Sequence, residues 1–230
     1  MLLVLWDIDG TLVDSAGHGR RAFEEAFEAV MGVPPADYPG IRETWTSSGL
    51  AGRTDHQIAQ AMLGEAHDRL PRMLEELAAA LGRRAELIRA EGHPHPGARE
   101  ALEALARRNG VVQSLLTGNL EANAAVKLAA FGLERLVDLE VGGYGSDPHD
   151  ARSDLVAVAR GKAAAKYAEA TRTVLIGDTP LDVRAAHEAG ARAVAVATGP
   201  YGVDELRASG ADAVLSDLRD TAAVLRAVGA

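Results

Sequence analysis

Short, mostly apolar segments alternate along the chain with longer segments of helical periodicity. Residues 2–6 are continuously apolar, and comparable short segments follow at 111–116 and 173–176. Runs of this length, bounded by turn residues, predict strands that are buried on both faces. We expect further strands at 136–141 and 193–197, and a last short one near the end of the chain. Strands that alternate with helices predict an α/β fold with a doubly wound parallel sheet.

The stretch between the first two strands has helical periodicity throughout. Its first helix, 19–31, repeats apolar side chains at i, i+4, i+7 and i+8 and ends at Gly32. Thr54 or Asp55 can cap a short second helix. A third apolar stripe consists of Leu70, Leu74, Leu77, Leu81 and Ile88.

This change of pattern predicts two domains. The first is an α/β core made of residues 1–15 and 93–230, and the second is a helical domain of residues 16–92 inserted into it. The inserted segment leaves the sheet near Asp9 and returns near Pro96. It can therefore sit over the strand ends, where a lid would lie.

Composition narrows the class of protein without changing the expected fold. Of the 230 residues, 47% are hydrophobic and 25% are charged, which is ordinary for a globular protein. The formal net charge of −9 argues against a nucleic-acid partner or an anionic membrane surface. The chain has no cysteine, which excludes disulfides and a thiolate nucleophile. Because the first strand is too short for a signal peptide and no apolar run reaches membrane-spanning length, we expect a cytoplasmic protein.

Polar residues follow three of the predicted strands. Asp7 and Asp9 follow the first, Thr117 ends the second, and Asp178 and Asp182 follow the third. Each alone could be a solvated turn or a helix cap, but all three together are harder to explain in that way. In open α/β sheets, ligands bind at the carboxyl ends of the strands. The carboxylates would form an oxygen-only cluster there, which suits Mg²⁺.

Other motifs are absent or lack the context that they need. An EF-hand loop requires a third Asp or Asn before its glycine, but Gly10 follows Asp9 directly. His93 and His95 lie in a proline-rich linker without a third ligand nearby, so we do not expect them to bind metal. Serine-hydrolase, P-loop and dinucleotide-binding motifs are not present.

Three segments resemble motifs of the haloacid dehalogenase superfamily. They are Asp7-Ile8-Asp9-Gly10-Thr11, Leu116-Thr117-Gly118-Asn119 and Gly177-Asp178-Thr179-Pro180-Leu181-Asp182. Within that superfamily the chain is similar to the phosphoglycolate-phosphatase-like group, through Gly52-Arg53-Thr54-Asp55 and Thr198-Gly199-Pro200-Tyr201-Gly202. The resemblance covers nearly the whole chain. It implies a Rossmann-like core with a small α-helical cap.

The resemblance also implies a role for each matching residue. Asp7 would attack phosphorus and become an aspartyl phosphate, and Asp9 would act as general acid and then as general base. Mg²⁺ would be held by Asp7, the backbone carbonyl of Asp9 and Asp178, with Asp182 in support. The residues that would bind phosphate are Gly10, Thr11, Thr117, Gly118 and Asn119.

The third motif of the superfamily departs from the usual pattern. It normally contains a lysine, whereas this chain has Arg152 at the corresponding place, 26 residues before Asp178. Arginine keeps the positive charge and contacts phosphate in a different, bidentate geometry. Lys162 and Lys166 would be in the middle of a helix, where lysines usually extend into solvent, so we assign the role to Arg152.

We therefore expect a Mg²⁺-dependent phosphatase acting on a small phosphate monoester, similar to phosphoglycolate or a sugar phosphate. A β-phosphoglucomutase-like mutase shares the cap, the paired aspartates and the phospho-enzyme, so it remains an alternative, and a non-catalytic regulator is a more remote one. Cap residues 45–55 are expected to face the pocket, where Arg53 would bind a carboxylate or second phosphate unless it is simply a surface residue. The residues do not indicate the oligomeric state.

Overall fold

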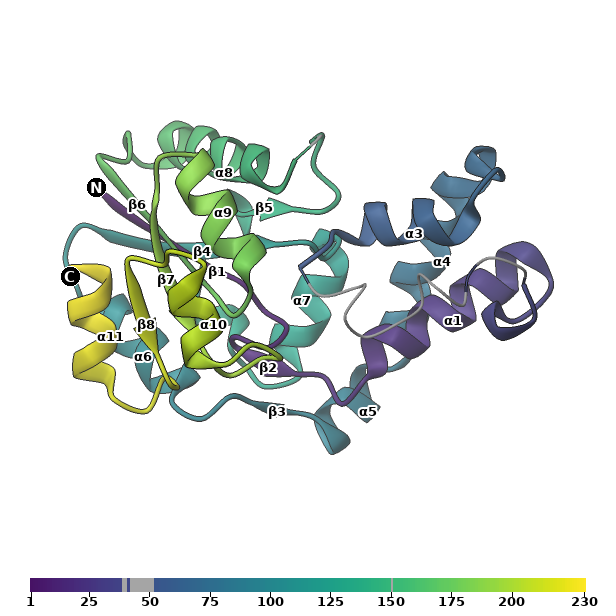
Figure 1. The fold of residues 1–230 in the computed structure, drawn as a ribbon, viewed down its shortest axis with the longest axis horizontal. Coiled ribbons are helices and arrows are strands. Elements are labelled where there is room, and N and C mark those ends of the chain that lie inside the picture. Colours follow the sequence, from purple (N-terminus) through teal and green to yellow (C-terminus); the bar gives the residue numbers. More distant parts are fainter. Residues whose placement is uncertain (39–40, 42–51, 150) are drawn as a thin grey trace.

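The computed structural model describes residues 1–38, 41, 52–149 and 151–230. Its centre is a six-stranded sheet with the order β5-β4-β1-β6-β7-β8, and every neighbouring pair is parallel (Figure 1). The strands are β1 (Leu2–Trp6), β4 (Val111–Thr117), β5 (Gly143–Tyr144), β6 (Arg172–Gly177), β7 (Arg192–Val196) and β8 (Ala213–Leu215). Helices cover both faces of this sheet, which confirms the predicted doubly wound α/β fold.

The central strand, β1, divides its side chains between two hydrophobic layers. All five of its residues are buried. Val4 and Trp6 pack in one layer, and Leu3 and Leu5 pack in the other. Trp6 lies in register with residues of both β4 and β6, so the carboxyl ends of the three strands meet at one edge. Any polar residues that follow these strands are thereby brought together.

Two sets of helices enclose the sheet. The layer of Val4 and Trp6 is covered by α6 (Ala98–Ala106), α7 (Glu121–Ala129) and α11 (Thr221–Val228). The opposite layer is covered by α8 (Arg152–Lys166), α9 (Pro180–Glu188) and α10 (Val203–Ala208). No helix within the described ranges is long and apolar enough to cross a membrane.

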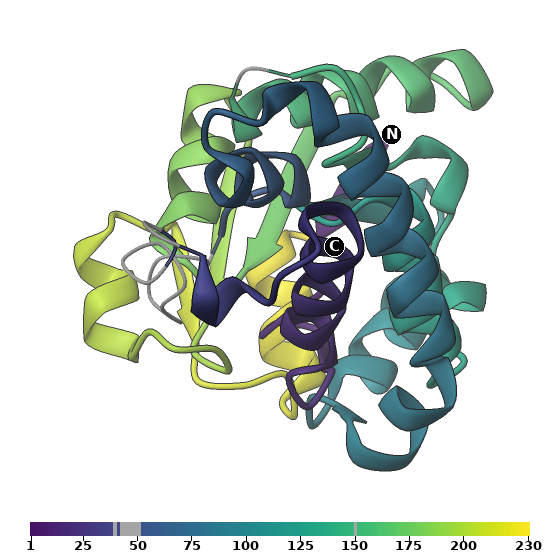
Figure 2. The same cartoon turned by 90° about the vertical axis from the view of Figure 1, so that its right-hand side faces the viewer.

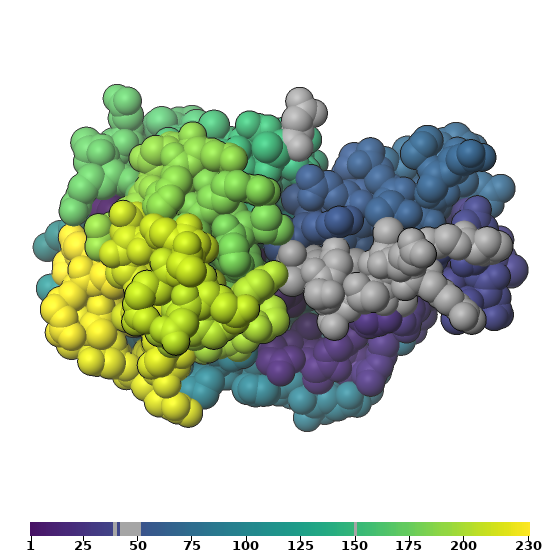
Figure 3. Space-filling model, viewed as in Figure 1, coloured from purple at the N-terminus to yellow at the C-terminus, as the bar shows by residue number. Residues whose placement is uncertain are grey.

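In the part of the chain that the structure describes, four more helices form a separate helical unit at one end of the sheet (Figure 1). They are α1 (His18–Met31), α3 (Asp55–Leu63), α4 (Leu70–Arg83) and α5 (Ala85–Glu91), with short 3₁₀ turns at Pro35–Asp37 and His67–Arg69. Their buried side chains form a third hydrophobic cluster, which includes Phe27, Met62 and Leu77. Viewed from that end, α1 and α4 lie in front of the sheet (Figure 2), and the surface of α3 meets that of the α/β part (Figure 3).

The apolar stripe expected to continue from Leu70 to Ile88 is divided between two helices. α4 ends and α5 begins on either side of Arg84. Gly82, two residues earlier, lowers the helix propensity at this point. The guanidinium of Arg84 pairs with Glu25 of α1. The break therefore holds Arg84 against α1, while Ile88 remains in the hydrophobic cluster of the helical unit.

A small antiparallel pair joins the two ends of the helical unit. β2 (Val13–Asp14) pairs with β3 (His93–Pro94), and Asp14 lies opposite His93. Strands of two residues leave no periodic pattern, so the sequence did not predict them. The pair places the exit from the α/β part and the return to it side by side, just beyond the carboxyl end of β1.

The prediction of a strand at 136–141 is wrong. The chain forms 3₁₀ turns at Glu134–Leu136 and Leu139–Val141, and the edge strand β5 follows in the glycine-rich loop. Asp138 favours the turn because its side chain accepts the Glu140 N–H at 3.0 Å. A Cβ on Gly143 would lie 2.3 Å from the Leu155 carbonyl oxygen of α8. Only glycine therefore lets the chain approach α8 closely enough to pair with β4.

Candidate active site

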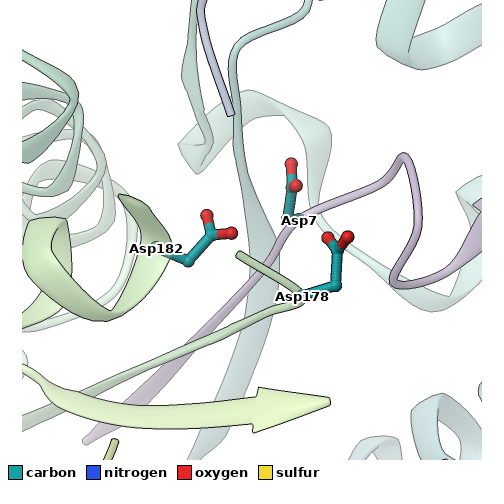
Figure 4. A group of neighbouring side chains, drawn as sticks. All are labelled: Asp7, Asp178 and Asp182. Carbon is teal, nitrogen blue, oxygen red and sulfur yellow. The ribbon is translucent and has the colours of Figure 1, made fainter. Parts of the chain in front are cut away.

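Three buried carboxylates meet at the carboxyl edge of the sheet. Asp7 follows β1, Asp178 follows β6, and Asp182 is in the first turn of α9 (Figure 4). One oxygen of each lies within 4.8 Å of the others. Their exposures are 6%, 1% and 2%, respectively. The structure thus brings together the three side chains that the sequence identified as candidate metal ligands.

A helix cap holds Asp182 in this cluster. Thr179 is the N-cap of α9, and its hydroxyl donates to Asp182 Oδ2 at 2.7 Å. The backbone N–H of Thr179 donates to the same oxygen at 3.1 Å. This is a capping box, which leaves the side chain of Asp182 with one orientation. The second carboxylate oxygen, Oδ1, remains directed toward the cluster, where it binds Arg152 at 2.7 Å.

The donor set fits a hard divalent cation such as Mg²⁺. Burial raises the pKa of Asp7 to about 7, against the opposing effect of Arg152, and burial together with the neighbouring carboxylates raises that of Asp178 to about 8. A cation among them would relieve both effects, and oxygen ligands are those that Mg²⁺ prefers. A Cβ on Gly10 or on Gly199 would lie 2.3 or 1.7 Å from Asp178 Oδ2. These two glycines therefore leave room for the Asp178 carboxylate.

Arg152 is the cation of the cluster. It is the first residue of α8, and its Nη2 lies 3.2 Å from Asp7 Oδ1 and 2.7 Å from Asp182 Oδ1. Its Nε has no hydrogen-bond partner among the residues that the structure describes. Lys162 and Lys166, on the same helix, instead form ion pairs away from the cluster: Lys162 with Asp147, and Lys166 with Asp138 and Glu140.

Asp9 belongs to a second polar network, beside the first. Lys127 Nζ donates to Asp9 Oδ1 at 2.7 Å and to Asp9 Oδ2 at 2.6 Å. Asn119 Nδ2 donates to the same Oδ2 at 2.8 Å, and Asn119 Oδ1 accepts from Lys127 at 2.6 Å. Lys127 and Asn119 hold the pKa of Asp9 below its ordinary value, against the loss of water around the carboxylate, which acts in the opposite direction. The side chain of Asp9 remains 45% exposed.

Sequence reasoning missed Lys127. It lies in the middle of α7 and is only 4% exposed, although a lysine there would normally extend into solvent. A signal was present, because Asn119, Asn123 and Lys127 follow one another at intervals of four residues. That spacing puts polar side chains on one face of a helix that starts at a strand end.

The end of β4 contributes Thr117 and Gly118. The buried hydroxyl oxygen of Thr117 accepts from Asn119 Nδ2 at 2.8 Å. The carbonyl oxygen of Gly118 accepts from the backbone N–H of Asp55 at 2.7 Å. A Cβ on Gly118 would lie 2.3 Å from the carbonyl oxygen of Arg53. Glycine is therefore required where the helical unit touches this strand end.

The carboxylate of Asp55 reinforces that contact. Its Oδ2 accepts from the backbone N–H of Leu120 at 2.8 Å and from Asn123 Nδ2 at 3.0 Å. Both donors are at the start of α7, so a side chain of the helical unit supplies acceptors to a helix of the α/β part. Burial raises the pKa of Asp55. Through these contacts between described residues, α3 is held against the strand end that carries Thr117.

Thr11 has a different position from the other expected phosphate-binding residues. Its hydroxyl is fully buried and donates to Asp178 Oδ1 at 3.0 Å. The hydroxyl therefore orients a candidate metal ligand, and its expected contact with phosphate stays a prediction.

A cavity of about 340 Å³ lies between the helical unit and the strand ends. Its α/β side includes Asp7, Asp9, Gly10, Thr117, Gly118, Asn119, Lys127, Arg152 and Asp178. Arg53 also lines it and is exposed to solvent. Of the cap residues expected to face the pocket, 45–51 lie outside the described residues.

Comparisons with known proteins agree with this geometry. A family profile for haloacid dehalogenase-like hydrolases matches residues 4–187, a range that contains the carboxyl ends of β1, β4 and β6. "Probable phosphatase IndB" of Dickeya dadantii is 30% identical over 210 residues, which cover 90% of this chain and 86% of that protein. "Phosphoglycolate phosphatase, plasmid" of Cupriavidus necator is 31% identical over 231 residues, with coverages of 96% and 92%.

A solved structure, that of a hydrolase from Pseudomonas syringae, is similar in fold. Its TM-score is 0.68 at 23% sequence identity, and the match covers 98% of both chains. The family profile spans most of the chain, and the acidic cluster lies within the matched residues. The chain is therefore an enzyme that belongs to the haloacid dehalogenase-like hydrolase family.

Proposed function

We propose that this enzyme is a Mg²⁺-dependent phosphatase that hydrolyses a small-molecule phosphate monoester through an aspartyl phosphate on Asp7. The observation that carries the proposal is the meeting of three buried carboxylates with the guanidinium of Arg152. A carboxylate can attack a phosphate only where positive charge offsets the repulsion between them. The names of the relatives, which are phosphatases, support the same class of reaction.

Asp7, Asp178 and the backbone carbonyl of Asp9 would hold Mg²⁺, with Asp182 in support. When bound, the ion supplies neutralising charge between these carboxylates and the phosphate oxygens. Asp182 has the supporting role because its two oxygens already bind Arg152 and Thr179.

Asp7 would be the nucleophile. One of its carboxylate oxygens forms a bond to phosphorus while the bond between phosphorus and the alcohol oxygen breaks. Arg152 orients this carboxylate and favours its ionised form, and its Nε–H, which has no partner among the described residues, would donate to a phosphoryl oxygen. The hydroxyl of Thr117 and the amide of Gly118 would hold another phosphoryl oxygen.

Asp9 would move the proton. It first protonates the leaving alcohol oxygen, and it then takes a proton from the water that attacks the aspartyl phosphate. Lys127 favours the ionised carboxylate, which the second step requires. The negative charge of a bound phosphate group favours the protonated form, which the first step requires. The two influences on Asp9 therefore serve different steps.

We propose that residues 16–92 form a cap domain over the site, and that residues 1–15 and 93–230 form the catalytic core. The separate hydrophobic cluster of the helical unit and the cavity beneath it support this division. A phosphosugar mutase would have to keep water from its phospho-enzyme. The carboxylate of Asp9 is 45% exposed, so water reaches the proton-transferring group, and this favours hydrolysis.

We infer that the substrate is a small molecule because the cavity holds only about 340 Å³. The relatives named as phosphoglycolate phosphatases suggest a short phosphate ester, and Arg53 would bind an anionic group on it. No nucleic-acid or membrane partner is expected at a net charge of −9. The cytoplasmic location stays a prediction.

The decisive experiment measures phosphate release from a panel of small phosphate esters, with Mg²⁺ or with a chelator. We expect release by the wild type only with Mg²⁺, and none by Asp7→Asn. Borohydride added during turnover reduces an acyl phosphate, so mass spectrometry should find homoserine at position 7. Asp204→Asn is the matched control, because Asp204 is exposed on α10 and pairs only with Arg207 among the described residues.

Two results would contradict the proposal. If Asp7→Asn still released phosphate, the proposed aspartyl-phosphate intermediate would be wrong. If the wild type released no phosphate from any ester, the proposed phosphatase activity would be wrong. If glucose 1-phosphate gave glucose 6-phosphate without free phosphate, the mutase alternative would replace hydrolysis.

A further inference from the structure

The cavity has two chemically different walls. The α/β side carries carboxylates, amides and the two buried cations described above. On the side formed by the helical unit, four apolar residues line the cavity beside the charged Arg20, Arg53 and Asp55: Phe23 of α1, Ile58 of α3, and Leu77 and Leu81 of α4. We call these four residues the apolar wall. With the phosphate group against the α/β side, the alcohol part of a substrate would face the helical unit.

The two buried cations of the cavity lie on its α/β side, with the carboxylates. Lys127 binds Asp9, and Arg152 binds Asp7 and Asp182. Arg20 donates to Glu24 at 3.3 Å. Arg53 is exposed to solvent, so its charge lies at the open side of the cavity.

The burial of the apolar wall has a consequence for the substrate. Its members are at most 7% exposed, so most of their surface is packed in the hydrophobic cluster of the helical unit, and the part that lines the cavity is small and apolar. A carboxylate or hydroxyl group pressed against them would lose water without gaining a hydrogen bond, which is unfavourable. An alkyl or aryl group in the same place would leave water, which is favourable for apolar surface.

We propose that the substrate is a phosphate monoester whose alcohol part ends in an apolar group, which packs against Phe23, Ile58, Leu77 and Leu81. This proposal rests on the phosphatase function proposed above and narrows its substrate class. It places phosphoglycolate, whose alcohol part ends in a carboxylate, among the poorer substrates. The anionic group that Arg53 would bind is then the phosphate of the ester itself, and not a second anionic group on the alcohol.

A series of alkyl phosphates tests the apolar wall directly. Ethyl, propyl, isobutyl and 3-methylbutyl phosphate leave as alcohols of nearly equal acidity, so their bond-breaking chemistry is the same. We expect kcat/KM with Mg²⁺ to rise along the series, by about tenfold or more per added carbon at the steepest step. Phosphoglycolate should be poorer than isobutyl phosphate by at least about tenfold, although its alcohol is no poorer a leaving group.

Two matched variants separate the apolar wall from the general packing of the helical unit. Ile58→Thr places a hydroxyl in the wall. Ile88→Thr makes the same change in the same hydrophobic cluster, on α5 and away from the cavity. We expect the dependence of kcat/KM on chain length to flatten in Ile58→Thr and to persist in Ile88→Thr. Equal flattening in both variants would overturn the assignment to this wall.

The result also distinguishes this inference from the proposed function. If the wild type releases phosphate from all of the esters with Mg²⁺ but shows no dependence on chain length, the inference fails and the phosphatase stands. A preference for phosphoglycolate over isobutyl phosphate would overturn the inference in the same way. If no ester is hydrolysed, the proposed function itself fails.

Discussion

Lys127 Nζ lies 2.6 Å from Asp9 Oδ2, although 118 residues separate the two along the chain. The contact joins the residue that follows β1 to the middle of α7, and Asn119 bridges both groups. Asp9 is thereby kept ionised in the enzyme without substrate, since Lys127 and Asn119 hold its pKa below the ordinary value. Lys127 acts through Asp9 and is a positioning residue.

Removing the charge at position 127 should change the pH dependence of the reaction. In Lys127→Met the pKa of Asp9 rises, so the limb of the kcat/KM profile that reports Asp9 should move to higher pH. We expect kcat to fall roughly tenfold to hundredfold, a part of what general acid–base catalysis supplies. Lys166→Met is the matched control on α8. A slower Lys127→Met enzyme with an unmoved profile would indicate a packing role only.

The stabilisation by Mg²⁺ should increase with pH. The raised pKa values of Asp7 and Asp178 mean that the metal-free fold is favoured by their protonation, below about pH 4. That stability is lost as the pH rises through about 7 and 8, where both groups ionise in the folded state. Mg²⁺ replaces the protons, so the rise in Tm that it causes should be larger near pH 8 than near pH 5.

Asp178→Asn provides the comparison for this measurement. It removes one carboxylate, so we expect a much smaller rise in Tm with Mg²⁺ at the higher pH. Asp204→Asn should behave as the wild type. Equal rises in Tm at both pH values, or an undiminished rise in Asp178→Asn, would contradict a metal site at these carboxylates.

Arg152 should be irreplaceable by lysine. Arg152→Lys keeps the charge but loses the planar guanidinium, whose Nη2 contacts both Asp7 and Asp182 while Nη1 donates to the Gly52 carbonyl, so kcat should fall at least about tenfold. Arg152→Met leaves buried carboxylates without their cation and should lower the free energy of unfolding by about 3–5 kcal/mol in chelator. Arg160→Lys, on the same helix, should leave kcat unchanged. Equal kcat values for Arg152→Lys and the wild type would contradict the assignment.

The carboxylate of Asp55 should hold the helical unit onto the start of α7. Asp55→Asn keeps the shape but replaces charged hydrogen bonds to Leu120 and Asn123 by weaker ones. We expect hydrogen exchange at the Leu120 amide to be about tenfold faster, which corresponds to about 1.4 kcal/mol. KM should rise more than kcat falls. Asp37→Asn, exposed in the same helical unit, is the control, and unchanged exchange at Leu120 would contradict the docking role.

The acidic cluster could be predicted because it depends on local patterns. An apolar run followed by Asp7, and another followed by Asp178, indicates two buried strands with carboxylates at their ends. Because strands that alternate with helices run parallel, the carboxyl ends of both strands lie at the same edge of the sheet. The position of Arg152 followed from the resemblance to a known motif. No packing information was needed for these steps.

The remaining features depend on contacts between distant segments. The sequence around Lys127 does not distinguish it from a solvent-exposed helical lysine, because its burial depends on the packing of α7 against Asp9. The apolar residues in 136–141 suggest a strand, but Asp138 forms a turn through its own side chain. The local sequence also does not indicate that the hydroxyl of Thr11 donates to Asp178. Each of these outcomes is decided by a partner that the local sequence does not contain.

The pairing of β2 with β3 has a consequence for how such an enzyme can change. The two short strands are the arms of a hairpin, and the whole helical unit is the loop between them. The entropic cost of closing a loop grows slowly with loop length, so the core tolerates inserted segments of very different size and sequence. The residues that would select the alcohol are in that loop, while those that would cleave the ester are outside it. Substitutions in the inserted segment can therefore change which alcohol is selected without altering the residues that would cleave the ester.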